Sequence, residues 1–413
     1  MKNKSITPGF LLLAFLLYLA ASTCAGVQGT DDGSGAASGS RETSVSATSV
    51  TLSERIAAAQ AAAATSSSCQ AISIGTDGDN GFYWEIGDEN GIVVDPQSGL
   101  SASGSVNPPG DGSTNYTRTT SMPIASASKW IYGSYVAETQ AVFQNGAWRI
   151  PDADVPFLNF TSGYDNMNDA CSATATGLSD PTVGDCLNQP GTLKGTTNGT
   201  RITSDGGHFF YNSGHMEVFQ GGGDASIANV MNGANDDDAT LASKVAAAFG
   251  ARAVQVNLTY FTPILAGGVV TTPADYAAFL QGMVRSDNPL IMSFLLNPAA
   301  LDPAAVCTNP FDPACPTAIY SPAEGVESWH YAIAHWIEDD PYNGDGSYSS
   351  PGAYGFYPWV DATKQYYGIV ARANLINVAT SIRASTYYKS VACGQIIRSA
   401  FFGDEIFSNG FEL

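Results

Sequence analysis

Short apolar runs typical of β-strands lie near both ends of the chain, separated by turns rich in Gly, Asp and Asn. Their β-branched and aromatic residues, bounded by these turns, are typical of antiparallel strands. The runs cover residues 72–75, 81–87, 91–95, 328–338, 354–361 and 365–372. We treat 328–338 as one continuous strand, on which His330 and His335 would point to opposite faces. The predicted strands therefore come from the two ends of the chain.

Helical patterns fill the middle of the chain. An Ala-rich run from Ser53 to Ala64 predicts a first helix capped by Ser53. Further helices are predicted within 123–138 and over residues 238–251, 273–285, 290–296 and 385–400. Strands from both ends around a helical middle predict an α/β (α+β) fold, with one antiparallel sheet flanked by helices.

We expect one domain over residues 51–400. Its sheet part would be 51–125 and 326–400, and its helical and loop-rich insertion would be 126–325. The chain has 413 residues, of which 44% are hydrophobic, so the domain can bury a core and a dry active site. A formal charge of −21, with no cluster of basic residues, argues against nucleic acid or an anionic membrane surface as a partner.

Residues 1–25 have the pattern of a signal peptide: two lysines, an apolar core and small residues up to Ala25. The core is too short to span a bilayer, so no stable membrane span is expected. Cleavage after Ala25 would give a secreted or periplasmic protein, whereas lipidation of Cys24 would give an anchored lipoprotein. Residues 26–50 are a Gly/Ser/Thr-rich tether that we expect to be disordered, and 401–413 form a C-terminal tail.

Processing of the N-terminal segment at either position consumes Cys24 and leaves six of the seven cysteines, an even number that suits an oxidising compartment. We predict the pairs Cys171 with Cys186, Cys307 with Cys315, and Cys69 with Cys393. The first two close short loops and the third ties the ends of the domain together. Metal binding is the alternative use of these cysteines. The chain has no Cys-x-x-Cys and its four histidines are not at ligand spacing, so we expect no metal and no other cofactor.

One Ser-x-x-Lys occurs in the chain, from Ser126 to Lys129. The preceding proline predicts a loop that leads into a helix, with both side chains on one helical face. A serine hydroxyl becomes nucleophilic when a neighbouring group takes its proton, and a lysine among apolar residues near the positive end of a helix can do so. By itself, the motif fits a solvated helix start equally well.

Three more stretches follow the first in a fixed order. The four are Ser126-Ala-Ser-Lys129, Leu158-Asn-Phe-Thr-Ser-Gly163, Phe210-Tyr-Asn-Ser-Gly214 and Ser350-Pro-Gly-Ala-Tyr-Gly-Phe-Tyr-Pro-Trp-Val-Asp361. They resemble the Ser-x-x-Lys, Leu-x-x-Thr-Ser-Gly, Tyr-x-Asn and Lys/His-x-Gly motifs of the serine β-lactamase and penicillin-binding-protein superfamily. The most similar branch holds class C β-lactamases, D-alanyl-D-alanine peptidases, β-lactamase-like esterases and 6-aminohexanoate-oligomer hydrolases. The resemblance covers about residues 51–400, with looser matches at 165–205 and 216–325.

This resemblance implies acyl transfer through a covalent intermediate on Ser126. Tyr211 would act as base and then as acid, because a phenol beside the cation of Lys129 loses its proton more readily. The backbone amides of Ser126 and Ala353 would hold the oxyanion. Gly352 would be small because two backbone segments approach closely there.

Two departures from the family pattern bear on the substrate. Ser350 stands where the family has Lys or His, which weakens recognition of a substrate carboxylate. Ser213 stands where an asparagine usually binds the substrate amide and the lysine, a change that resembles the esterase and oligomer-hydrolase members. Neutral esters or linear amides are then better substrates than penicillins, unless one of three arginines supplies a cation from elsewhere. These are Arg118, Arg149 and Arg201.

Other conspicuous side chains have ordinary interpretations. His208 and His215 flank Tyr211 and are interpreted as loop histidines, with a hydrogen bond to the active site as the alternative. Trp329, Trp336 and Trp359 are interpreted as core residues, with pocket-wall aromatics as the alternative.

The sequence therefore predicts a secreted serine hydrolase that acts on a small or oligomeric ester or linear amide. A β-lactamase or D-Ala-D-Ala carboxypeptidase is one alternative. A binding or sensor domain of the same fold, acylated without turnover, is the other.

Overall fold

The computed structural model describes residues 50–73, 81–107, 115–168, 171, 176–218, 235–299, 301–323, 326–374 and 381–403. The predicted signal peptide, Cys24, nearly all of the tether and most of the C-terminal tail lie outside these residues. Among the residues described, no helix combines the length and the apolar character needed to cross a membrane.

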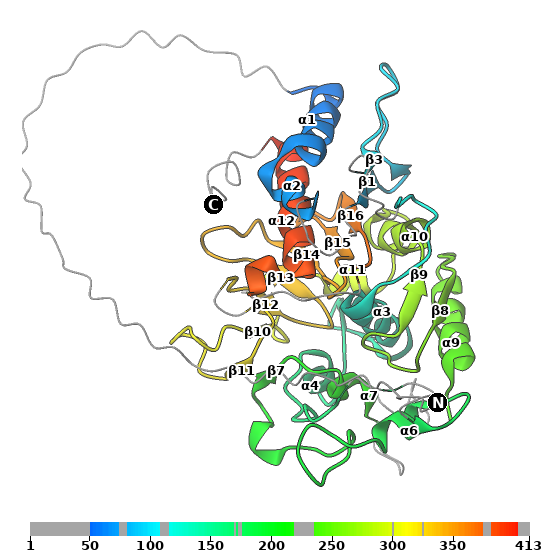
Figure 1. Ribbon diagram of the computed structural model, residues 1–413, viewed down its shortest axis with the longest axis vertical. Coiled ribbons are helices and arrows are strands. Elements are labelled where there is room, and N and C mark those ends of the chain that lie inside the picture. The colour runs from blue at the N-terminus through cyan, green and yellow to red at the C-terminus, as the bar shows by residue number, and fades with distance from the viewer. Residues whose placement is uncertain are drawn as a thin grey trace, which may run out of the picture. The chain divides into compact units, whose positions relative to one another are not determined.

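The centre of the fold is one antiparallel sheet assembled from both ends of the chain (Figure 1). The strands along its path are β10 (Val306–Cys307), β12 (His330–Tyr331), β13 (Trp336–Glu338), β14 (Ser347–Ser349), β15 (Tyr357–Val360), β16 (Tyr367–Ala371), β1 (Phe82–Asp88) and β2 (Gly91–Ile92). A further strand, β3 (Ser103–Val106), pairs with β1. The two ends meet where β1 pairs with β16, which sets Tyr83 opposite Ala371 and Gly87 opposite Tyr367. The predicted sheet is confirmed.

α-Helices occur where the helical patterns predict them. They are α1 (Leu52–Thr65), α3 (Ser128–Gln140), α9 (Asp238–Gly250), α10 (Pro273–Val284), α11 (Met292–Leu295) and α12 (Thr386–Phe402). α12 and α10 both pack on β15 and β16, and Figure 1 shows them on opposite sides of the sheet. Every residue of β15 and β16 is buried as a result. The predicted α/β (α+β) fold class, with helices flanking the sheet, is confirmed.

The predicted cap of α1 is wrong, because Thr51 rather than Ser53 is the N-cap. The Thr51 hydroxyl accepts a hydrogen bond from Glu54 N at 3.3 Å, and the Glu54 carboxylate accepts one from Thr51 N at 2.8 Å. This reciprocal pair satisfies two N–H groups at the helix start. The Ser53 hydroxyl instead donates to Ser98 Oγ at 2.8 Å.

The strand predicted at 72–75 is wrong where the structure describes it. Ile72 lies in the last turn of a second helix, α2 (Ser67–Ser73). Cys69 on α2 is bonded to Cys393 on α12, and α2 packs along α12. Tertiary packing therefore overrides the strand preference of the β-branched Ile72.

The prediction of one continuous strand over residues 328–338 is wrong. Two strands, β12 and β13, lie there, and residues 332–335 join them. Ala334 has φ +60°, and its N–H donates to Leu158 O at 2.9 Å. Leu158 ends the short helix α4 (Val155–Leu158), so the turn is fixed by a segment far away in sequence. His330 and His335 therefore do not share a strand, and the prediction that they point to opposite faces of one strand is wrong.

Two small sheets frame the segments that carry the family-like motifs. In the first, β9 (Val269–Thr271) lies between β4 (Met122–Pro123) and β8 (Leu258–Tyr260). In the second, β7 (Phe209–Phe210) pairs in parallel with β11 (Ala318–Tyr320). The remaining elements are β5 (Val142–Gln144), β6 (Ala147–Arg149), α6 (Val183–Leu187), α7 (Gly214–Glu217), and the 3-10 turns η1 (Ala125–Ala127), η2 (Thr203–Asp205) and η3 (Ile382–Ala384).

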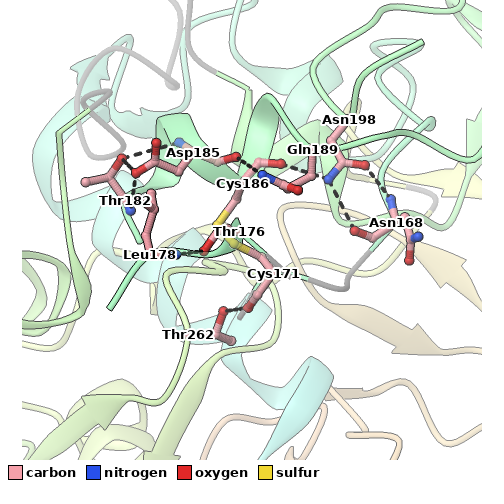
Figure 2. The surroundings of a disulfide bond; sticks show 10 residues. All are labelled: Asn168, Cys171, Thr176, Leu178, Thr182, Asp185, Cys186, Gln189, Asn198 and Thr262. Carbon is pink, nitrogen blue, oxygen red and sulfur yellow. Dashed lines mark hydrogen bonds between the residues drawn. A yellow bond between two sulfur atoms is a disulfide. The ribbon is translucent and has the colours of Figure 1, made fainter. Parts of the chain in front are cut away.

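All three predicted disulfides are present: Cys69–Cys393, Cys171–Cys186 and Cys307–Cys315. Around the second bond, the Asn198 amide donates to Cys186 O at 2.8 Å and to Asn168 O at 3.3 Å (Figure 2). The Asn168 N–H donates back to Asn198 Oδ1 at 2.8 Å. Thr262 hydrogen-bonds to the carbonyl of Cys171. Side-chain bonds thus organise a region with little regular secondary structure.

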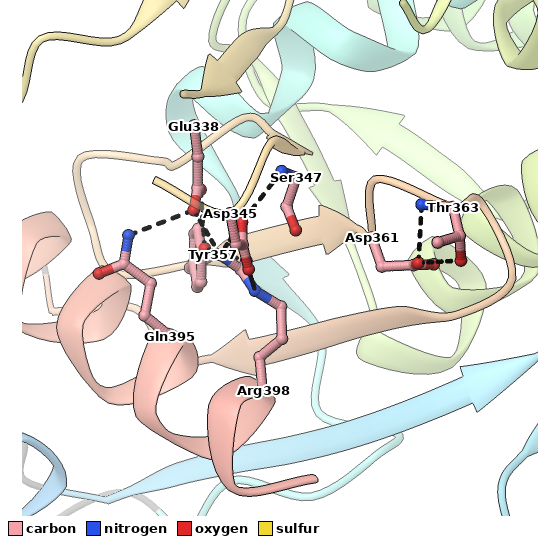
Figure 3. Close-up of polar contacts among 8 residues, drawn as sticks. All are labelled: Glu338, Asp345, Ser347, Tyr357, Asp361, Thr363, Gln395 and Arg398. Carbon is pink, nitrogen blue, oxygen red and sulfur yellow. Dashed lines mark hydrogen bonds and ion pairs between the residues drawn. The ribbon is translucent and has the colours of Figure 1, made fainter. Parts of the chain in front are cut away.

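A buried charged network joins α12 to the sheet (Figure 3). Arg398 is 0% exposed and lies 2.8 Å from Glu338 and 2.7 Å from Asp345. Tyr357 accepts from Arg398 at 2.9 Å and donates to Glu338 at 2.7 Å, and Gln395 donates to Glu338 at 3.2 Å. The guanidinium therefore satisfies two carboxylates at once.

We expect Arg398→Met to lower the free energy of unfolding by about 3–5 kcal/mol, because it leaves Glu338 buried without its cation. Urea unfolding of the two proteins measures this difference. Arg285→Met is the matched control, since its partner Asp287 has a side chain that is 84% exposed. An equally small effect of both substitutions would contradict the prediction.

Glu327 predicts a dependence of stability on pH. Burial, followed by the nearby charges of Glu338 and Asp340, raises its pKa from 4.5 to about 8, and Arg383 opposes the shift. A carboxyl with a raised pKa in the folded state stabilises the fold below its ordinary pKa, and this contribution is lost as the pH rises through the folded value. The free energy of unfolding should therefore fall between about pH 4.5 and about pH 8. Glu327→Gln should flatten that fall in urea unfolding, and identical slopes in the two proteins would exclude this role.

Candidate active site

The start of α3 presents Ser126 on a sharp turn. Ser126 lies in η1, directly after Ala125, whose φ of +45° is in the left-handed region. The turn is anchored on β9, because Ile124 N donates to Val269 O at 3.1 Å and Val269 N donates to the Ser128 hydroxyl at 3.2 Å. A half-buried serine on a strained turn is a common setting for a nucleophile.

Lys129 lies one turn along the helix and is 3% exposed. Its Nζ donates to Ser126 Oγ at 3.0 Å and to Ala266 O at 2.9 Å. The same nitrogen lies 4.9 Å from the centre of the Tyr211 ring. The structure thus brings together the three predicted residues Ser126, Lys129 and Tyr211.

Tyr211 is held by aromatic rings. It follows β7, and its N–H donates to Tyr320 O at 3.1 Å. Its ring stacks on Trp336 with centroids 5.3 Å apart and meets the rings of Phe160 and Tyr331 edge to face. Trp336 is 3% exposed, so it is both a core residue and the platform for Tyr211.

The fourth stretch lies against the start of α3. The Ser350 hydroxyl donates to Ser126 O at 3.0 Å, and Ser350 is 2% exposed. A Cβ added at Gly352 would stand 2.1 Å from Ile124 O, so only glycine fits this approach. Ala353 is exposed, and its N–H donates no hydrogen bond within the part of the chain that the structure describes.

Ser213 is the predicted site residue that the structure does not link to the others. It is the N-cap of α7, 5% exposed, and its carbonyl accepts from Met216 N at 2.9 Å. In the described residues, no hydrogen bond joins Ser213 to Lys129 or Ser126.

Two residues of α7 form hydrogen bonds next to this site: His215, whose alternative prediction was such a bond, and Glu217, which the sequence did not predict. His215 is 1% exposed, and burial lowers its pKa to about 3, so the ring is neutral. Its Nε2 donates to Phe210 O at 3.0 Å, and its Nδ1 therefore accepts from Ser162 Oγ at 2.7 Å. Glu217, 1% exposed, accepts from Ala266 N at 2.8 Å. The sequence signals His215 only by its distance from Tyr211 and gives no signal for Glu217.

The histidines His330 and His335 do not belong to a group of side chains, in the described part of the chain, that could bind a metal ion. His335 is 0% exposed, stacks on Trp130 of α3, and has its pKa lowered to about 4 by burial. His330 Nδ1 lies 2.9 Å from Asp339. Among the residues described, no three His, Cys, Asp or Glu side chains gather closely enough to hold a metal ion.

No protein-family model and no curated protein matches the chain. Among solved structures, it is similar to a candidate β-lactamase from Bacteroides dorei DSM 17855, with 18% identity, 78% of this chain and 93% of that chain covered, and a TM-score of 0.45. A mutant of simvastatin synthase (LovD) from Aspergillus terreus has 12% identity, 88% and 100% coverage, and a TM-score of 0.47. A candidate 6-aminohexanoate-dimer hydrolase from Bacillus anthracis has 15% identity, 79% coverage of each chain, and a TM-score of 0.41.

We expect Gly352→Ala to lower kcat by about 10²-fold or more, because the added methyl group must push Ala353 away from the start of α3 and so displace the N–H that the sequence predicts as an oxyanion donor. Steady-state kinetics on an ester substrate measure this loss. Gly250→Ala is the matched control, since a Cβ at Gly250 meets nothing within 4 Å. A Gly352→Ala enzyme with the kcat of the control would contradict this role.

Proposed function

We propose that this chain is a secreted serine hydrolase that cleaves ester or linear amide bonds through an acyl intermediate on Ser126. The observation that carries the proposal is the 3.0 Å hydrogen bond between Lys129 Nζ and Ser126 Oγ, made by a lysine that is 3% exposed. With Tyr211 beside the lysine, the site contains the nucleophile and the proton-transfer groups that acyl transfer needs.

In the proposed reaction, Ser126 Oγ attacks the carbonyl carbon of the substrate while its proton passes to Tyr211. The bond to the leaving group then breaks, and Tyr211 returns the proton to that group. Water repeats the sequence on the acyl-enzyme and releases the acid. Lys129 keeps Ser126 Oγ within hydrogen-bond distance, and its Nζ lies 4.9 Å from the centre of the Tyr211 ring.

The oxyanion is assigned to the backbone amides of Ser126 and Ala353. The Ala353 N–H is suited to this role because it has no hydrogen-bond partner in the described part of the chain. Preorganised donors of this kind stabilise the charge that develops in the transition state.

The substrate class follows from the absence of a cation in the fourth stretch. Ser350 is buried and donates to Ser126 O, so its hydroxyl is already used and does not replace a family lysine as a carboxylate ligand. Arg118 pairs with Glu85 at 2.9 Å, and Arg201 donates to Ser162 O at 2.8 Å. These contacts engage two of the three candidate arginines, while Arg149 is exposed on β6. They support a preference for neutral esters or linear amides over substrates that carry a carboxylate next to the scissile bond.

The test is hydrolysis of a p-nitrophenyl ester series, nitrocefin and a 6-aminohexanoate dimer by the wild type and by Ser126→Ala. We expect short esters or the dimer to be hydrolysed, and Ser126→Ala to lose about 10³-fold or more of that activity. Rapid nitrocefin turnover would instead favour a β-lactamase. Labelling of Ser126 without release of the acyl group would favour a sensor, and a fully active Ser126→Ala would exclude Ser126 as the nucleophile.

A further inference from the structure

We propose that α7 positions both partners of Ser126, with Glu217 acting on Lys129 and His215 acting on Tyr211. The proposal rests on the function proposed above. α7 is only four residues long and begins three residues after Tyr211, so a single turn of helix carries one side chain to Ala266, which holds Lys129, and one to Phe210, which precedes Tyr211.

Glu217 acts on Lys129 through Ala266. The Glu217 carboxylate accepts from Ala266 N at 2.8 Å, and the carbonyl of the same residue accepts from Lys129 Nζ at 2.9 Å. Ala266 is 0% exposed, so both bonds lie in the protein interior. A shift of Ala266 would therefore carry the ammonium away from Ser126 Oγ.

The position of Ala266 matters more in this chain than in the family pattern, because Ser213 stands where an asparagine usually binds the lysine. In the described residues, Lys129 makes two hydrogen bonds, to Ser126 Oγ and to Ala266 O, and Ser213 makes none to it. Of these two acceptors, Ser126 Oγ is the proposed nucleophile, and Ala266 O takes no part in the proposed reaction. Whatever fixes Ala266 also fixes Lys129.

His215 acts on Tyr211 through the peptide that precedes it. Its Nε2 donates to Phe210 O at 3.0 Å, while Ser162 Oγ donates to its Nδ1 at 2.7 Å. Its ring stacks on Phe160 with centroids 5.1 Å apart, and Phe160 also contacts the ring of Tyr211. His215 therefore connects the stretch over residues 158–163 to the peptide that precedes Tyr211 and orients it.

The arm through Glu217 is tested with two mild substitutions. Glu217→Gln keeps an acceptor oxygen at the same reach, and we expect a kcat close to that of the wild type. Glu217→Asp keeps the charge but withdraws the acceptor by one methylene, and we expect kcat to fall by about 10-fold or more with KM changed by less than about 3-fold. The reverse result, a loss in Glu217→Gln and none in Glu217→Asp, would show that charge matters and would overturn positioning through Ala266.

The arm through His215 is tested in the same way. His215→Phe keeps a ring for stacking on Phe160 but removes both hydrogen bonds, and we expect a fall in kcat of about 10-fold to 100-fold with little change in KM. His215→Gln keeps a donor for Phe210 O and should recover part of that loss. A wild-type kcat in His215→Phe would overturn the proposed role of His215.

Gln395→Met is the control for a purely structural effect, because it removes a buried polar contact, to Glu338, that belongs to the α12 network. We expect it to lower the Tm and leave kcat unchanged at a temperature where it is folded. If Glu217→Asp and His215→Phe behave in the same way, α7 has only a structural role and the proposal is wrong.

Ser126→Ala in the same assay separates the two proposals. An inactive Ser126→Ala with fully active α7 variants overturns this one alone, whereas an active Ser126→Ala overturns both.

Discussion

The site depends on how the charge of Lys129 is accommodated in the protein interior. An ammonium that is 3% exposed has lost its water and needs other dipoles around it. A serine hydroxyl, a peptide carbonyl and the face of a tyrosine ring supply them, and no carboxylate forms an ion pair with it among the residues described. Ser126, Ala266 and Tyr211 come from three separate segments of the chain, so the burial of one lysine requires all three to be in place.

Arg398, which is also deeply buried, is accommodated in the opposite way. Arg398 pairs with two carboxylates and a phenol, and this arrangement locks α12 onto the sheet (Figure 3). Arg398 is thus held by carboxylates, which suits a fixed structural role, whereas Lys129 is held by neutral groups. The two cations therefore have different surroundings: Arg398 fastens α12 to the sheet, and Lys129 contacts two residues of the candidate site.

Local patterns predicted those parts of the fold that depend on local chemistry. The helices α9, α10 and α12 and the strand β1 follow periodicity and turn residues, and the disulfide pairing follows from the positions of six cysteines. The failures occur where distant contacts decide the structure. Ile72 is helical because α2 is fastened to α12, and the strand at 328–338 is broken because Ala334 binds to Leu158.

The same distinction applies to the site. Ser126 and Lys129 share a helical face, so their proximity follows from spacing alone, and the order of the motifs added Tyr211. Glu217 and Ala266 are 49 residues apart and His215 and Ser162 are 53 apart, and neither pair has a periodic or motif signal in one sequence. Such contacts become visible only when the fold is known.

The buried amide beside the Cys171–Cys186 bond also affects how the protein can be produced. Asn198 begins Asn198-Gly-Thr200, the tripeptide that eukaryotic secretory pathways glycosylate on the side-chain nitrogen. In the fold, that nitrogen donates to two carbonyls and Asn198 is 0% exposed (Figure 2). A sugar attached to the nascent chain would have to occupy space that the folded protein does not have. In a glycosylating host, sugar transfer to Asn198 and folding therefore compete for the same side chain, and only chains that escape the transferase can reach this structure.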